Sequence, residues 1–141
     1  MEMMKTASSV EQDVYTLLTG SALASTVNGA VYRSGYRPAG SGKEDIVVVY
    51  TSGDARQIQD GIVTVLIYVP DIEFRKDRRP VKDGARCSQL EAAALTWFGG
   101  LNTAQNDYRF TLDRAIQTVP DPDTREHFVS LRLRFRHLTD N

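Results

Sequence analysis

The sequence contains two runs of strand-forming residues, Ile46-Val47-Val48-Val49-Tyr50 and Ile62-Val63-Thr64-Val65-Leu66-Ile67-Tyr68-Val69. β-Branched and aromatic side chains such as these fit a pleated, half-buried surface. The residues between the runs are typical of turns, and Pro70 ends the second run because proline has no N–H for a ladder. The stretch therefore predicts a long β-hairpin with arms at 45–51 and 57–69. Neither arm alternates between apolar and polar residues, so we expect both of its faces to be covered.

The end of the chain has the cleanest alternation in the sequence. One set of side chains is mostly apolar and the other mostly polar: His127, Val129, Leu131, Leu133, Phe135 and His137 against Phe128, Ser130, Arg132, Arg134 and Arg136. A period of two indicates a strand with one buried face and one polar face. Its three arginines then form a ladder about 13 Å long on one side.

Like charges on neighbouring positions of a strand repel each other unless an opposite charge compensates them. The arginine ladder, defined as Arg132, Arg134 and Arg136, leaves four interpretations open. It lies on a solvated face, pairs locally with Asp113 on a neighbouring strand, meets another subunit, or lines a channel that holds a polyanion.

Two amphipathic helices are also predicted. Ser8 with Glu11, and Ser88 with Glu91, form capping boxes ahead of apolar residues at helical spacing. Gly20 and the pair at 99–100 are the expected helix ends, and Ser21 is expected to cap a further short turn.

The remaining segments predict a short strand near 31–34 and a further strand at 108–119. Strands grouped in hairpins with helices between them are typical of an α+β fold. We therefore expect one domain over 1–141, with a mainly antiparallel sheet of about five strands and two helices packed on one face. Residues 1–7 are expected to be a disordered tail and 71–86 a long charged loop.

The composition favours a single soluble globular domain. The chain has 141 residues and a formal net charge of −1, so no overall field recruits nucleic acid or a membrane. The single Cys87 excludes an internal disulfide and suits a reducing compartment. There is no signal-peptide pattern at the N-terminus and no apolar run of membrane-spanning length, so we expect a cytoplasmic protein.

Basic residues in two loops are further candidates for contacts with a subunit or a channel. In the predicted loop 71–86 basic and acidic side chains interleave, which favours docking on a partner over nucleic-acid binding. Gly42-Lys43 resembles part of a phosphate-binding loop, but Arg37 and Glu44 stand where that motif requires Gly and Ser or Thr. With the arginine ladder, the candidate contact residues are Arg75, Lys76, Arg78, Arg79 and Lys43.

The sequence carries little that indicates catalysis. His127 and His137 lie on the same strand face but about 33 Å apart, too far to share a metal ion. No paired Cys or His motif and no nucleophile motif is present, so we expect no enzyme activity, metal or cofactor. A Ser–His–Asp arrangement assembled in space stays possible on sequence alone.

In its layout the chain resembles the small tail-completion and tail-terminator proteins of long-tailed bacteriophages and prophages. The resemblance runs from about Val10 to Leu138 and has no catalytic signature. The charged segment 71–86 is a departure from the resemblance, because it stands in place of no motif of the family. The segments that carry it are the helix from Val10 to Leu18, Asn-Gly-Ala-Val-Tyr-Arg at 28–33, Ile-Val-Val-Val-Tyr at 46–50 and Asp-Gly-Ile-Val-Thr-Val-Leu-Ile-Tyr at 60–68.

The resemblance implies a non-enzymatic structural protein of the virion tail, assembled in the cytoplasm. Such proteins form a ring, commonly hexameric, that ends the tail tube and meets the neck or connector proteins. The partners would be further copies of the chain and the tail-tube and neck proteins. DNA that passes through the tail would make non-specific contacts, and no membrane is involved. Two alternatives remain open: another head–tail connector or neck component, and a small bacterial ligand-binding α+β domain.

Overall fold

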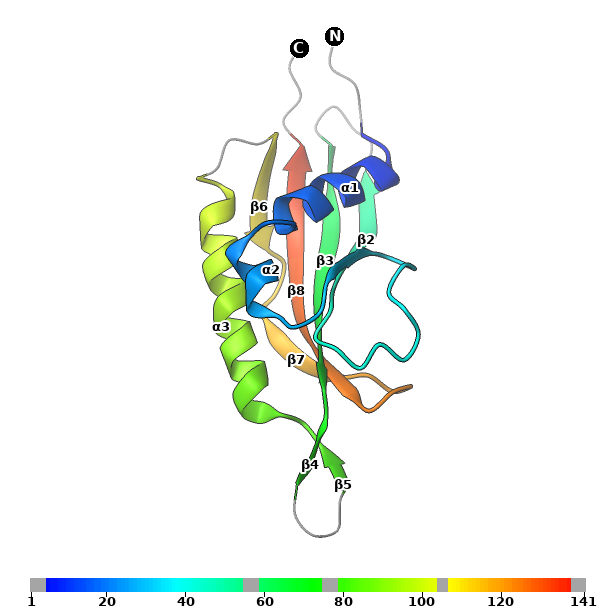
Figure 1. Ribbon diagram of the computed structural model, residues 1–141. Coiled ribbons are helices and arrows are strands. Elements are labelled where there is room, and N and C mark those ends of the chain that lie inside the picture. The colour runs from blue at the N-terminus through cyan, green and yellow to red at the C-terminus, as the bar shows by residue number, and fades with distance from the viewer. Residues whose placement is uncertain (1–4, 55–58, 75–78, 104–106, 138–141) are drawn as a thin grey trace.

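A six-stranded sheet carries two helices on one face in the computed structural model (Figure 1). The structure describes residues 5–54, 59–74, 79–103 and 107–137. In chain order its elements are α1 Ala7–Leu18, α2 Ala22–Thr26, β1 Val31–Arg33, β2 Ile46–Asp54, β3 Gln59–Pro70, β4 Ile72–Phe74, β5 Arg79–Val81, α3 Gly84–Leu101, β6 Tyr108–Leu112, β7 Gln117–Pro120 and β8 Glu126–His137.

The last strand of the chain lies inside the sheet. The strand order is β1-β2-β3-β8-β6. β6 and β7 share one edge of β8, with β6 along the C-terminal half of β8 and β7 along its N-terminal half. β3 and β8 pair over twelve residues, from Gln59 opposite His137 to Pro70 opposite Glu126. Among the strands that the structure describes, only β1 and β2 pair in parallel. The predicted α+β class, the mainly antiparallel sheet and the two long helices on one face are confirmed.

The core lies between these helices and the sheet. Each turn of α1 contributes one fully buried residue, Val10, Val14 and Leu18, because these positions recur on one helical face. From α3, Leu90 and Ala94 enter the same core. On the sheet side the core is formed by alternate residues of the central strands: Val63, Val65, Ile67, Leu131, Leu133 and Phe135.

Both long helices begin earlier than the capping boxes predicted. Thr6, not Ser8, caps α1 and accepts a hydrogen bond from the Ser9 amide, so residues 5–7 are ordered and the predicted tail is wrong there. Asp83, not Ser88, caps α3 through the Arg86 amide. The helix also continues through its two late glycines. Leu101 beyond them is almost fully buried, and its packing stabilises the last turn.

The segment predicted as a long charged loop contains regular structure. β4 and β5 form a two-stranded antiparallel ribbon, with Ile72 opposite Val81 and Phe74 opposite Arg79, and α3 has begun by Gly84. A single residue, Asp71, separates β3 from β4, so the ribbon extends the long hairpin strand beyond the end of the sheet (Figure 1). The loop prediction is wrong here because the interleaved charges concealed the short alternating strands.

The predicted strand 108–119 is two strands. β6 and β7 pair with different halves of β8, and the chain leaves the ladder between them at 113–116. In this break, Asp113 donates its amide to the Arg132 carbonyl while Ile116 packs against the core. The break places the Asp113 side chain beside the outward side chains of β8.

Candidate assembly surface

The sheet face opposite the helices is the surface that the sequence singled out. Strand pairing places Arg132, Arg134 and Arg136 on this open face, at the positions that alternate with the buried core residues of β8. Their exposure rises along the strand, from half-buried Arg132 to exposed Arg134 and Arg136. The predicted arginine ladder is therefore present.

Two of the three arginines of the ladder form ion pairs with Asp113. Arg132 donates from Nε to Asp113 over 2.8 Å, and Arg134 donates to the other oxygen of that carboxylate over 3.0 Å. Burial opposes ionisation of Asp113, but these hydrogen bonds and charges prevail and hold its pKa below the ordinary value. Asp113 is thus the neighbouring-strand partner that the sequence offered as one interpretation.

The third arginine of the ladder, Arg136, lies among residues that were not predicted to be contact residues. Arg136 is the cross-strand neighbour of Arg109 on β6, and Thr111 is the neighbour of Arg134. The alternation of buried Tyr108 and Phe110 with exposed Arg109 places Arg109 on the open face. That alternation was visible in the sequence, but the register against β8 was not.

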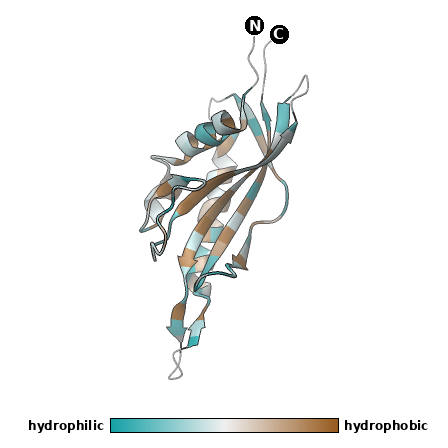
Figure 2. Cartoon of the chain, turned by 90° about the vertical axis from the view of Figure 1, so that its right-hand side faces the viewer, coloured by the Kyte–Doolittle hydropathy of each residue, from teal (hydrophilic) through white to brown (hydrophobic). Residues whose placement is uncertain are grey.

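The other half of the open face is apolar and aromatic. Tyr68 and Phe128 are cross-strand neighbours whose ring centroids lie 5.7 Å apart. Val49, Leu66 and Val119 are half-buried on the same face. The turned view shows apolar residues running along the strands (Figure 2). Within the described chain no helix covers this face, which differs from the two-sided covering that the hairpin composition predicted.

One loop does reach the end of this face. Arg37 lies over the Tyr68 ring at 4.0 Å and bonds to Asp45 over 2.9 Å and to Glu126 over 2.6 Å. Burial works against its charged form, but the hydrogen bonds to Glu126 and Asp45 raise the pKa of Arg37. The Lys43 carbonyl also accepts from Arg37, while the Lys43 side chain is exposed. The loop 37–43 is therefore anchored to the sheet in the single chain.

The basic residues of the ribbon are separate from the arginine ladder. Arg79 is exposed on β5, and Arg75, Lys76 and Arg78 lie outside the described residues. The ribbon follows the end of β3 that pairs with the start of β8, whereas Arg136 lies near the opposite end of β8 (Figure 1). The structure therefore does not bring Arg79 and the ladder together on one site.

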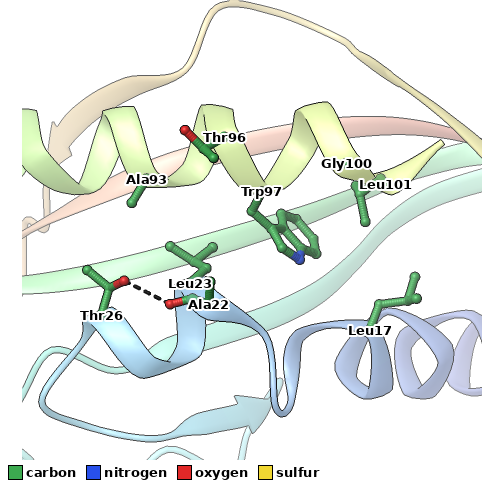
Figure 3. A pocket seen from close by; sticks show the side chains of 9 residues that line it. All are labelled: Leu17, Ala22, Leu23, Thr26, Ala93, Thr96, Trp97, Gly100 and Leu101. Carbon is green, nitrogen blue, oxygen red and sulfur yellow. Dashed lines mark hydrogen bonds between the residues drawn. The ribbon is translucent and has the colours of Figure 1, made fainter. Parts of the chain in front are cut away.

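An apolar cavity of about 460 Å³ lies on the helical side, between α2 and α3 (Figure 3). Leu17, Leu23 and Trp97 are among the side chains that line it, and Trp97 also packs against the core. The hydroxyls of Thr26 and Thr96 donate to backbone carbonyls of their own helices. The cavity is thus lined mainly by apolar side chains, and these two hydroxyl protons are already used within the helices.

Groups with possible chemical roles are dispersed. In the part of the chain that the structure describes, no three His, Cys, Asp or Glu side chains are placed to hold a metal ion. Burial raises the pKa of the Cys87 thiol. His127 Nδ1 lies 2.7 Å from Asp71, and His137 is fully buried at the far end of β8. No described helix is long and apolar enough to cross a membrane.

Comparison with known protein families finds no family model that matches the chain. A search of curated proteins likewise finds no significantly similar sequence.

Proposed function

We propose that this chain is a non-enzymatic structural protein of a bacteriophage or prophage tail. It caps the tail tube as an oligomeric ring of identical subunits and joins the tube to the head connector. Two independent lines support this proposal: the resemblance of the sequence layout to tail-terminator proteins, and a sheet surface suited to contacts between subunits.

The open face of the sheet is the observation that carries the proposal. β2 and β3 have the composition of strands buried on both faces, but described helices cover only one face. The uncovered side combines the half-buried apolar residues Leu66, Val119 and Phe128 with the arginine ladder. An apolar patch next to charged groups is typical of a protein interface. A heterologous contact through such a face generates a closed ring when its rotation closes.

The β4–β5 ribbon supplies a second contact element. It extends away from the sheet and exposes 41% of Ile72, although isolated two-stranded ribbons are at best marginally stable in water. Packing against a neighbouring subunit would bury this side chain and stabilise the ribbon. We therefore place Ile72 and Arg79 in the subunit contact, with the ribbon of one copy on the body of the next.

Native mass spectrometry over a range of protein concentrations tests the proposal, with negative-stain imaging of large species. We expect a closed ring of about six subunits. Phe128→Glu places a charge in the apolar half of the open face and should shift the protein to monomers. The matched control Leu95→Glu changes an exposed leucine on α3 and should leave the ring intact.

Addition of purified tail tubes covers the case in which the ring forms only on its partner. A chain that stays monomeric with and without tail tubes contradicts the proposal. Capture by portal-side proteins but not by tail tubes would instead favour the neck-component alternative. A small molecule that binds in the mainly apolar α2–α3 cavity would instead favour the ligand-binding alternative.

A further inference from the structure

A concave site lies on the open face near the C-terminal end of β8. Its volume is about 280 Å³, and residues from three adjacent strands line it: Asp60, Arg109, Thr111, Arg134, Phe135 and Arg136. The strand register explains why they meet. Arg136 has Asp60 of β3 on one side and Arg109 of β6 on the other, and Thr111 is opposite Arg134 in the adjacent row.

The positive charges in this site are only partly paired among the described residues. Arg134 shares Asp113 with Arg132. Arg109 donates to the carbonyl of its own neighbour Tyr108, and neither Arg109 nor Arg136 has a carboxylate within 4.0 Å among the described residues. Like charges placed directly opposite on adjacent strands destabilise a sheet. The Arg109–Arg136 pair therefore has no ion-pair partner within 4.0 Å among the described residues, although Asp60 lies opposite Arg136 on β3.

The surrounding surface adds to this positive field. Although the whole chain carries a net charge of −1, five arginines here stand against three aspartates. The arginines are 109, 114, 132, 134 and 136, and the aspartates are 54, 60 and 113, with Asp54 the cross-strand partner of Asp60. A concave, basic surface on a nearly neutral protein concentrates anions locally.

We propose that this concavity is a binding site for a phosphate group, held by Arg109, Arg134 and Arg136 with Thr111 as an additional donor. Guanidinium groups are planar forks that bond two oxygens of phosphate at once. A tetrahedral phosphate presents oxygens in several directions and so can face donors from two strands, whereas a planar carboxylate is satisfied by one fork. The phosphate belongs either to a nucleic-acid backbone or to a small phosphate compound. The site needs no oligomer and does not depend on the tail-terminator proposal.

Titration of the isotopically labelled protein with inorganic pyrophosphate, followed by heteronuclear NMR, tests the site. We expect saturable shifts at the amides of Arg109, Thr111, Arg134 and Arg136. Arg109→Ser/Arg136→Ser should weaken binding at least about tenfold, since two charge-assisted contacts are lost. The control Lys82→Ser/Arg125→Ser removes two exposed charges elsewhere and should change the affinity by less than about twofold. Thr111→Glu, which introduces a carboxylate into the site, should also abolish binding and provides a second variant if the double serine variant fails to fold.

Competition between pyrophosphate and a short DNA duplex of arbitrary sequence distinguishes the two phosphate sources. If DNA displaces pyrophosphate, the site takes a nucleic-acid backbone, and the salt dependence of DNA binding should fall by about two counterions in Arg109→Ser/Arg136→Ser. If it does not, the ligand is a small phosphate compound. Shifts that never saturate, or equal weakening in the two double variants, would overturn the proposal and leave only non-specific attraction.

Discussion

At the scale of single residues, close packing constrains the long hairpin most strongly at Gly61. A Cβ built there would lie against the Ser52 carbonyl, the Gly53 Cα and the Phe135 ring, all closer than ordinary contact. Two of these are backbone atoms of the paired strand and have no room to move. The glycine was visible in the sequence, but nothing in its neighbours indicated that a strand backbone and an aromatic ring close around it.

Gly61→Ala should therefore destabilise the fold, by about 1–3 kcal/mol, because the added methyl overpacks a closed site. Gly99→Ala is the matched control, since a Cβ on this exposed helical glycine meets nothing within 4 Å. That substitution should stabilise the protein by about 0.5–1 kcal/mol through helix propensity. Urea unfolding of both variants measures the difference, and equal effects would contradict the packing argument.

Acid sensitivity is also a residue-scale property. Arg86 donates to both oxygens of Glu44, over 2.7 and 2.8 Å, and only 7% of Glu44 is exposed. The hydrogen bond from Arg86 lowers the pKa of Glu44 from its ordinary 4.5, although burial opposes the shift. Because the folded pKa is the lower one, the pair contributes its full stability above pH 4.5 and loses it as the pH falls through the folded value.

Glu44→Gln should accordingly flatten the acid limb of the stability curve. At pH 7 we expect this variant to be about 1–2 kcal/mol less stable than the unmodified chain, because the charge-assisted hydrogen bonds are weakened. The gap should close as the pH falls below 4.5. Urea unfolding at a series of pH values measures the gap. A constant difference at all pH values would mean that ionisation of Glu44 does not contribute.

At the scale of elements, β8 holds the sheet together. It pairs with β3 over its whole length and with β6 and β7 on its other edge, and its inward residues from Val129 to His137 are buried. Its period-two alternation predicted both faces correctly. The first residues of the helices were predicted less well. The caps Thr6 and Asp83 have neighbours in the sequence that are equally suitable as caps.

Substitutions on the two faces of β8 should differ sharply. Leu131→Ala leaves a cavity in the core and should cost about 2–5 kcal/mol. Arg132→Ala, one residue along, removes a half-exposed pair with Asp113 and should cost at most about 1 kcal/mol. Thermal or urea unfolding measures both. Similar losses for the two variants would mean that the open face contributes to folding as much as the core does.

At the scale of the whole molecule, the arginine ladder is expected to serve assembly and not folding. Joint replacement of Arg132, Arg134 and Arg136 by serine should leave a folded monomer that no longer forms the proposed ring. The physical reason is that all three side chains lie on the uncovered face, and among the described residues Asp113 alone loses ion-pair partners. Circular dichroism and native mass spectrometry on the same sample separate the two effects.

The outcome that contradicts this expectation is an unfolded triple variant, or a folded one that assembles normally. Lys82→Ser/Arg125→Ser again serves as the control for loss of positive charge, because both residues are exposed and lie outside the open face. It should assemble like the unmodified chain.

The sequence by itself determined the local patterns: the hairpin strands, the two-sided alternation of β8 and the apolar stripes of the long helices. These depend on the period of the backbone, which each segment carries independently of the others. Only the tertiary structure decided which strands adjoin β8. It therefore decided that Asp113 forms ion pairs with Arg132 and Arg134, and that Arg109 lies opposite Arg136. Such pairings join residues far apart in the chain, and their register follows from how the whole core packs and not from any local pattern.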